Sequence, residues 1–236
     1  WDSISKQKTR FPFCAVTPSE WMNNQAKSSS CSDHLVKTIH NPVPKSYFKN
    51  RDQDACKRAL GISTERPLIL CIAGNLQEER KGGKILEEVL HSKFEDVNFL
   101  LIGRTTDSIA DHKENIYSLG FIQDELTMQI AYNAADLVIH PAPVDNLPNT
   151  VAEAMSAGTP VLAFQTGGLP EMVVPDKSGW LVPEINAQLM AQELHSIVKS
   201  KSYKNLRNST KGLAEQLFAP KEIGKQYMEL IQEIVS

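Results

Sequence analysis

The sequence contains no apolar run that approaches the roughly 18 residues needed to cross a bilayer. Its first residues, Trp-Asp-Ser-Ile-Ser-Lys, lack the apolar segment of a signal peptide, and the absence of an initial Met fits a chain cut from a longer one. Positive charge is not in excess, since 25 Lys and Arg stand against 28 Asp and Glu. A net charge of -3 gives no global field that would recruit nucleic acid or anionic lipid. We therefore expect a globular protein with no transmembrane segment and no nucleic-acid partner.

Metal-binding and redox motifs are also scarce. The four cysteines are too few for a disulfide scaffold and too widely spaced for a Cys-x-x-Cys motif, which indicates a reducing, cytosolic setting. The six histidines are scattered and form no group of ligands at the spacing of a zinc site. No Gly-x-Gly-x-x-Gly opens a helix after a strand, which disfavours a dehydrogenase. We predict that the protein holds no metal and no cofactor.

What is present is an alternation of short apolar runs with longer segments of helical period, which is typical of a parallel sheet flanked by helices. The expected strands are Leu68 to Ala73, Val97 to Ile102, Asn115 to Leu119, Asp136 to His140, Pro160 to Phe164 and Trp180 to Val182. The expected helices are Asp52 to Leu60, Lys84 to His91, Asp124 to Ala134, Pro148 to Ala157, Ala187 to Lys199 and two more between Tyr203 and Ile234. We predict an α/β, Rossmann-like fold, with the near-continuous aliphatic runs at the sheet centre, where both faces are covered.

The first 44 residues break this pattern. Thr17-Pro18-Ser19 begins a helix, and the two prolines of His40-Asn-Pro-Val-Pro44 interrupt the chain as a linker would. We therefore divide the chain into residues 1–44, which end in an interdomain linker, and residues 45–236, which form the main domain.

The most informative stretch runs from Asp145 to Glu171 and has two carboxylates eight residues apart. Asp145 ends the loop after a strand, and Glu153 lies in the second turn of the helix that this loop opens. The carboxyl ends of parallel strands face the crevice where open α/β sheets bind ligands. The helix start offers N–H groups and a positive dipole end to a phosphate. The pattern therefore suits an anion flanked by hydroxyl groups.

A second candidate loop follows the strand that ends at Ala73 and reads Gly74-Asn-Leu-Gln-Glu-Glu-Arg80-Lys81-Gly-Gly. Glycine lets the backbone approach a phosphate, and adjacent Arg and Lys side chains can contact its oxygens. The loop precedes a helix, so it also lies at the predicted ligand-binding edge of the sheet.

The first stretch, with Ala-Glu153-Ala-Met-Ser-Ala-Gly-Thr-Pro-Val and Gly-Gly-Leu-Pro-Glu171 in order, closely resembles the donor-binding signature of retaining glycosyltransferase family 4, also called glycosyl transferases group 1. The family has Glu where this chain has Asp145. The resemblance implies the C-terminal, nucleotide-sugar-binding half of a GT-B enzyme, with residues 1–44 as a remnant of the N-terminal acceptor domain and linker. It also implies a retaining transfer that needs no metal ion.

The resemblance implies a role for individual residues. Asp145 would hold the transferred sugar, Glu153 the ribose hydroxyls, and Arg80 and Lys81 the leaving diphosphate. We take Asp145, Arg80 and Lys81 as catalytic. The other implied donor-binding residues are Gly74, Asn75, Phe121, Ile122, His140, Asn146, Leu147, Asn149 and Thr150. Asn75 stands where the family has a basic residue, so either Arg80 turns inward or the site binds diphosphate more weakly.

These residues also have purely structural interpretations. Asp145 and Asn146 could cap the helix while Glu153 faces solvent. Arg80 and Lys81 could simply lie in a solvated charged turn. Phe121 could be an ordinary core aromatic, and His140 a histidine packed at the end of a strand.

We expect a glycosyltransferase that takes its sugar from UDP, with a GDP-sugar as the second option, and passes it to a glycan or lipid-linked acceptor held by the missing domain. Asp145-Asn-Leu-Pro-Asn-Thr is similar to transferases that build bacterial surface polysaccharides. The full-length enzyme would act in the cytoplasm or at the inner face of the membrane. The chain alone should bind the donor but transfer poorly, because it lacks an acceptor pocket.

Two other functions stay open. A nucleotide-sugar epimerase has a similar two-sheet build but needs further acid and base residues, and a non-catalytic nucleotide-binding module needs none. In the resembling family the final helix, here near Lys221 to Ile234, crosses back onto the acceptor domain. Without that domain we expect it to pack elsewhere or to be loosely held.

Overall fold

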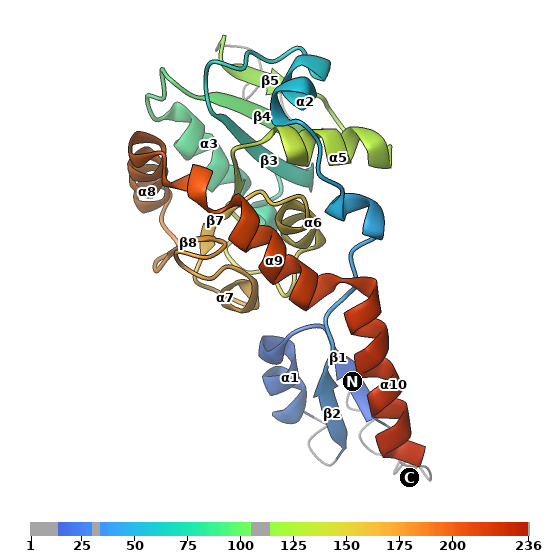
Figure 1. Ribbon diagram of the computed structural model, residues 1–236. Coiled ribbons are helices and arrows are strands. Elements are labelled where there is room, and N and C mark those ends of the chain that lie inside the picture. The colour runs from blue at the N-terminus through green and yellow to red at the C-terminus, as the bar shows by residue number, and fades with distance from the viewer. Residues whose placement is uncertain (1–13, 30–33, 105–113, 236) are drawn as a thin grey trace.

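The computed structural model describes residues 14–29, 34–104 and 114–235, so the first 13 residues of the 1–44 segment lie outside it. The main body is a six-stranded parallel sheet in the order β5-β4-β3-β6-β7-β8 (Figure 1). Its strands are β3 (Leu68–Asn75), β4 (Asn98–Arg104), β5 (Ile116–Ser118), β6 (Leu137–His140), β7 (Val161–Phe164) and β8 (Gly179–Val182). The predicted α/β, Rossmann-like fold is confirmed, and each predicted strand is present within two residues of its expected bounds.

Helices cover both faces of this sheet. One face carries α2 (Gln53–Ala59), α5 (Glu125–Ala134), α6 (Asn149–Ser156), the short α7 (Leu169–Met172) and α9 (Arg207–Phe218), and the other carries α3 (Gly83–His91) and α8 (Ala187–Ser200). Short 3-10 turns are η1 (Lys45–Phe48), η2 (Glu79–Lys81) and η3 (Ser202–Asn205). Within the described residues, no helix has the length and apolar character to span a bilayer.

The core divides into one apolar cluster on each face of the sheet. Successive strand residues alternate between the two clusters, because side chains in a strand point to opposite faces. Leu70 and Leu100 pack toward α5 and α6, whereas Ile69 and Leu101 pack toward α3, and all four are fully buried. Coverage on both sides explains why these strands are continuous aliphatic runs rather than alternating ones.

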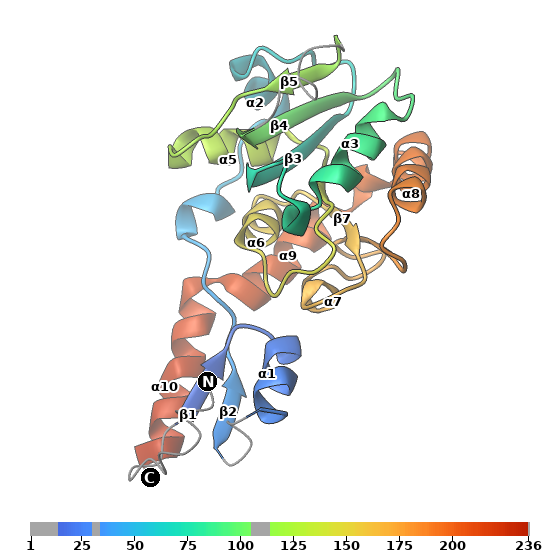
Figure 2. The same ribbon diagram turned by 180° about the vertical axis from the view of Figure 1, so that it is seen from behind.

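A small N-terminal unit stands apart from this body and consists of β1 (Cys14–Thr17), α1 (Glu20–Lys27) and β2 (Leu35–Thr38) (Figures 1 and 2). The last helix, α10 (Pro220–Val235), leaves the main body and lies along this unit. Ile223 and Leu230 pack with Ile39, and Lys37 Nζ lies 3.0 Å from Glu233 Oε2. The expectation that this helix packs elsewhere or is loosely held is therefore wrong, because Ile39, just after β2, and Cys14 of β1 give it apolar contacts.

Leu230→Ala should weaken this docking by roughly 2 kcal/mol, because truncating a buried Leu removes apolar contacts and leaves a cavity. Amide hydrogen exchange in α10, β1 and β2 should become faster, while exchange in β3 and β6 stays unchanged. Met228→Ala, on the same helix but with 57% of the side chain exposed, is the matched control. Equal exchange rates in the two variants would show that Leu230 does not hold the helix.

Candidate functional site

The candidate site forms where two loops leave neighbouring strands. β3 and β6 are adjacent, and the order of the strands reverses between them. Open α/β sheets bind ligands outside the carboxyl ends of the strands at such a switch point. Gly82 allows the loops to touch: its φ is +80°, and a Cβ there would lie 2.1 Å from the carbonyl oxygen of Pro141. The β3–α3 and β6–α6 loops therefore lie directly against each other.

Lys81 reaches across this junction to Asp145. Its Nζ donates a hydrogen bond of 2.8 Å to Asp145 Oδ2, and the two side chains are 26% and 16% exposed. His140, the last residue of β6, places Nε2 3.5 Å from the same oxygen, which is close enough for an ion contact but long for a hydrogen bond. That Nε2 is buried and makes no hydrogen bond within the described residues. The structure thus brings three predicted site residues together around one carboxylate oxygen.

Asp145 is held in its ionised form. Burial alone would raise the pKa of this carboxyl, but the contacts from His140 and Lys81 outweigh burial and hold the pKa well below its usual range. The carboxylate is therefore a pure hydrogen-bond acceptor at neutral pH, which suits a partner that donates, such as a hydroxyl group.

An uncapped helix start faces this cluster. A cavity of about 110 Å³ lies between the two loops and is lined in part by Lys81, His140 and Thr150. Thr150 stands in the first turn of α6, whose N-cap is Pro148, and no side chain caps this helix. The structural alternative, in which the polar residues before Pro148 cap α6, is therefore not what the structure shows. The N-terminal end of α6 and Lys81 together favour an anion here.

Glu153 lies one turn further along α6 and does not face solvent freely. It is half-buried, and its Oε2 accepts a 2.8 Å hydrogen bond from the hydroxyl of Tyr132 on α5. Burial raises the pKa of Glu153, the Tyr132 hydroxyl opposes that shift, and the charge of Glu125 adds to it. Sequence reasoning missed Tyr132, because nothing local marks a buried tyrosine 21 residues away as a partner of this carboxylate.

The rest of the β3–α3 loop departs from the expected arrangement. Gly74 is exposed at the end of β3 and has open space where a Cβ would stand. Asn75 Oδ1 accepts from the Gln77 N–H at 3.0 Å and closes the turn of its own loop. Arg80 does not turn inward: its side chain is 67% exposed, and its Nε donates to Glu78 Oε1 at 3.1 Å. Arg80 thus lies in the solvated turn of the structural alternative and does not replace the charge absent at Asn75.

The loop after β5 presents an aromatic ring to solvent. Phe121 is 54% exposed, so it is not a core aromatic, and the Arg104 guanidinium lies 5.8 Å from its ring centroid. Ile122 is half-buried and packs against the core. Arg104 ends β4, and sequence reasoning did not identify it, although its position at a strand end was the available signal. These residues line the same edge of the sheet as Lys81.

The β6–α6 loop is braced from two sides. Leu147 is 6% exposed and packs in the core, so its side chain does not point toward a donor, contrary to expectation. Asn149 is exposed at the start of α6. Asn146 Oδ1 accepts a hydrogen bond from Ser19 Oγ of the N-terminal unit. The β6–α6 loop is therefore in direct contact with the small N-terminal unit.

Glu171 makes the second contact between the two units. Its Oε2 and Oε1 accept hydrogen bonds of 2.8 Å from the N–H groups of Glu20 and Trp21, the first two residues of α1. A carboxylate is favourable at the positive end of a helix. The predicted signature contained Glu171, but its partners lie about 150 positions away, so the sequence offered no sign of this contact.

The family described as Glycosyl transferases group 1 matches residues 66–200, which is more than half of the chain. The chain belongs to this family. The predicted resemblance is thereby confirmed at the level of group 1 glycosyltransferases.

This group 1 chain spans less than half the length of the curated relatives that it matches here. The D-inositol 3-phosphate glycosyltransferase of Streptomyces bingchenggensis is 30% identical over 184 residues, which cover 69% of this chain and 40% of that protein. The putative colanic acid biosynthesis glycosyltransferase WcaL of Escherichia coli is 47% identical over 51 residues, 22% of this chain and 13% of that protein. The structure of Anabaena HepE in complex with UDP and glucose matches with a TM-score of 0.76 at 22% identity, over 94% of this chain and 64% of that one. This likeness shows the same fold, which is the predicted half of a GT-B architecture.

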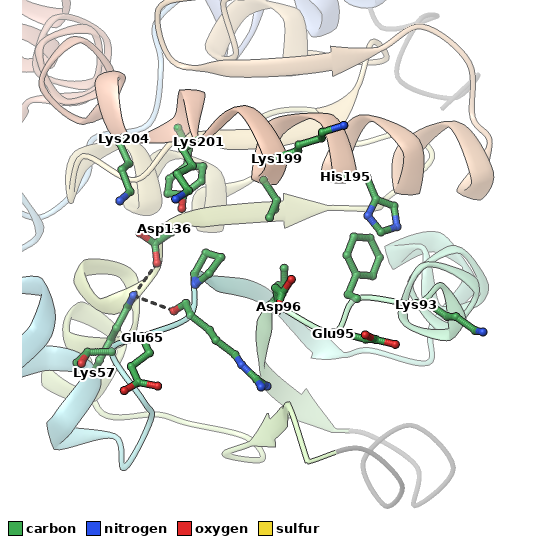
Figure 3. A pocket seen from close by; sticks show the side chains of 17 residues that line it. Lys57, Glu65, Lys93, Glu95, Asp96, Asp136, His195, Lys199, Lys201 and Lys204 are labelled. Atoms are coloured by element: carbon green, nitrogen blue, oxygen red, sulfur yellow. Dashed lines mark hydrogen bonds and ion pairs between the residues drawn. The ribbon is translucent and has the colours of Figure 1, made fainter.

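A second cavity lies elsewhere in this group 1 family member. It measures about 710 Å³ and opens at the amino ends of the strands, opposite the candidate site (Figure 3). Lys57 Nζ lies 2.7 Å from Asp136 Oδ2, which also accepts from the Leu68 N–H at 2.8 Å. Lys199 lines it from the last turn of α8, where positive charge suits the helix dipole. These contacts join strand and helix ends, so we assign this cavity a structural origin.

The two acidic residues at the start of α2, Asp52 and Asp54, have a structural role. The Asp52-Gln53-Asp54 triplet has the spacing of a diphosphate–metal motif, but it begins α2, where Asp52 Oδ1 accepts from the Ala55 N–H at 2.7 Å and caps the helix. In residues 14–29, 34–104 and 114–235, no three His, Cys, Asp or Glu side chains gather as a metal site would require.

Lys81→Met should destabilise the protein in a pH-dependent way. Asp145 has a lower pKa in the folded than in the unfolded chain, so its contacts contribute stability that is present above about pH 4 and is lost as the pH falls toward the folded-state pKa. The substitution removes one of these contacts and raises the pKa of Asp145. We expect a loss of roughly 1 kcal/mol at pH 7, measured by urea unfolding, which stays constant down to about pH 4 and shrinks as the pH falls further toward the folded-state pKa of Asp145.

Lys84→Met is the matched control for this experiment. Lys84 lies close to Lys81 in sequence, but its 3.4 Å contact with Glu79 is almost fully exposed. The control should leave stability unchanged at every pH. A Lys81→Met loss that does not shrink as the pH falls from about 4 toward the folded-state pKa of Asp145 would contradict the assigned coupling.

Proposed function

We propose that this chain is the nucleotide-sugar-binding part of a retaining, family 4 glycosyltransferase. The observation that carries this proposal is the cluster of Lys81, Asp145 and His140 at the switch point of the sheet, beside the uncapped start of α6. The spacing of Asp145 and Glu153 keeps the carboxylate pattern of the retaining family, and we carry that stereochemistry to this enzyme.

In this proposal the donor lies along the carboxyl edge of the sheet. Its diphosphate would occupy the start of α6 between Thr150 and Lys81, where N–H groups and an ammonium group meet. The sugar would then reach Asp145, and Glu153 would accept hydrogen bonds from the ribose hydroxyls. The base would lie toward the exposed ring of Phe121 and the backbone of Ile122.

Transfer would proceed without a metal ion. As the bond between sugar and diphosphate breaks, negative charge grows on the leaving group, and preorganised positive groups stabilise it. Lys81 and the dipole of α6 would supply this charge, and Arg80 would have to leave Glu78 to add to it. No further cofactor enters the scheme.

UDP is the proposed nucleotide, supported by the Anabaena HepE structure with UDP and glucose, and a GDP-sugar is the second option. A role in bacterial surface polysaccharide biosynthesis is supported by the match to WcaL, which is named for colanic acid biosynthesis. The acceptor would be a glycan or a lipid-linked glycan, bound by a further domain of a cytoplasmic enzyme. This chain alone would bind the donor but transfer sugar poorly.

The structure does not favour an epimerase. Such an enzyme needs several acid and base groups around one sugar carbon, and two of the four candidates are already engaged. Glu171 accepts from the start of α1, and Glu153 is bonded to Tyr132. Asp145 and His140 remain, and both belong to the cluster around Lys81.

Calorimetric titration of the chain with UDP-glucose, with and without magnesium, tests this proposal. We expect binding that does not depend on magnesium and that Glu153→Ala weakens about tenfold or more, because a hydrogen bond to a charged group contributes roughly 1.5–3 kcal/mol. Glu222→Ala, an exposed carboxylate on α10, is the control and should bind as the unmodified chain does. Binding that requires magnesium, or that Glu153→Ala leaves unchanged, would overturn the proposed site.

A further inference from the structure

A buried phenol holds the carboxylate that we assign to the ribose. Tyr132 is fully buried on α5, and its hydroxyl donates 2.8 Å to Glu153 Oε2 on α6. Burial, and next the negative charge of Glu153, raise the pKa of Tyr132 well above its usual value, so the hydroxyl stays protonated and always acts as the donor. The Tyr132 hydroxyl bonds to Oε2 of Glu153. The other carboxylate oxygen, Oε1, is the atom left to accept a hydrogen bond from a ligand.

Among the residues that the structure describes, no positive charge pairs with Glu153 in place of Tyr132. The ion pairs within the described residues do not include Glu153. The ionisable groups that act on Glu153 from neighbouring elements are Glu125 and Tyr132 of α5, and Glu153 in turn raises the pKa of Tyr47 in η1. On α9, Arg207 donates to the carbonyls of Asn133 and Ala135, and Lys211 to that of Phe48. The hydroxyl of Tyr132 is therefore the group that favours the charged form of Glu153.

A merely structural role would not require this hydroxyl. The Tyr132 ring packs in the core cluster and meets the ring of Tyr47 edge-on at 6.0 Å, and a phenylalanine ring would fill the same space. What the hydroxyl adds to that ring is a single hydrogen bond, which it donates to Glu153 Oε2. Its partner is a half-buried carboxylate at the ligand-binding edge of the sheet, on the helix whose start faces the cavity beside Lys81.

We propose that Tyr132 is a positioning residue for the nucleotide donor: it orients Glu153 and keeps it charged, so that Oε1 can accept from the ribose. This inference rests on the proposed donor site and identifies the residue that prepares it. Because the carboxylate is the accepting form, affinity for the donor should fall as the pH drops through the pKa of Glu153, and removing the hydroxyl should move that fall to higher pH.

Tyr132→Phe tests this role with two independent readouts. The first is the pKa of the Glu153 carboxyl in the ligand-free protein, followed by NMR, which should rise in the variant. The second is calorimetric titration with UDP-glucose from pH 5 to pH 8, chosen because its diphosphate diester does not itself titrate there. We expect affinity at pH 7 to fall about 3- to 10-fold, and the pH midpoint of binding to move upward.

Two further variants separate positioning from packing. Tyr203→Phe alters another buried tyrosine, in the opposite core cluster, and should leave the pKa of Glu153 and the affinity unchanged. In a Glu153→Ala background, Tyr132→Phe should cause no additional loss of affinity, because the partner through which it acts is gone.

The outcomes are distinct. An unchanged pKa of Glu153 in Tyr132→Phe, or a raised pKa with unchanged affinity and pH midpoint, would overturn the positioning role while leaving the donor site intact. Equal losses of affinity from Tyr132→Phe with and without Glu153 would also overturn it, since the effect would come from packing. If neither the unmodified chain nor Glu153→Ala binds UDP-glucose, the proposed function fails, and this inference fails with it.

Discussion

The parallel pairing of β3 with β6 is the contact on which the candidate site depends. Ile69 pairs with Leu137 and Leu70 with Val138, which joins the two halves of the sheet where its strand order reverses. At the amino ends, the carboxylate of Asp136 accepts both the Leu68 N–H and the buried ammonium of Lys57 and so holds the strands in register. At the carboxyl ends, the same register brings Lys81 to Asp145, although 64 positions separate them.

The electrostatics of the ligand-free site follow from this meeting of loops. Lys81 is already paired with Asp145, so a diphosphate must compete with an internal carboxylate for the same ammonium group. This competition costs some binding energy. The Lys81–Asp145 pair, however, keeps two charged groups ordered in a half-buried place before a ligand arrives. With Arg80 turned outward and Asn75 uncharged, the start of α6 becomes the main additional source of positive potential.

The sheet could be predicted because its evidence is local. Aliphatic runs such as Leu68 to Ala73 show period and length directly, and all six strands were found. Ordered motifs at strand ends led us to predict Asp145, Glu153 and Lys81 as site residues, and the structure places Lys81 beside Asp145. The orientation of Arg80 could not be predicted, since a neighbouring Glu78 and a distant phosphate compete for an exposed side chain. The Glu171 contact with α1, the docking of α10 and the bond from Tyr132 depend on tertiary packing between segments far apart in sequence, for which one sequence holds no signal.

The central claim is that the start of α6 and Lys81 together receive the diphosphate of a nucleotide sugar. A crystal structure of this chain with UDP-glucose, grown without divalent cations, tests it most directly. The account predicts a diphosphate at the first turn of α6 near Thr150, with Lys81 Nζ moved from Asp145 to a phosphate oxygen. A nucleotide bound at the opposite edge of the sheet, among lysines such as Lys199, with the Lys81–Asp145 pair undisturbed, would contradict it.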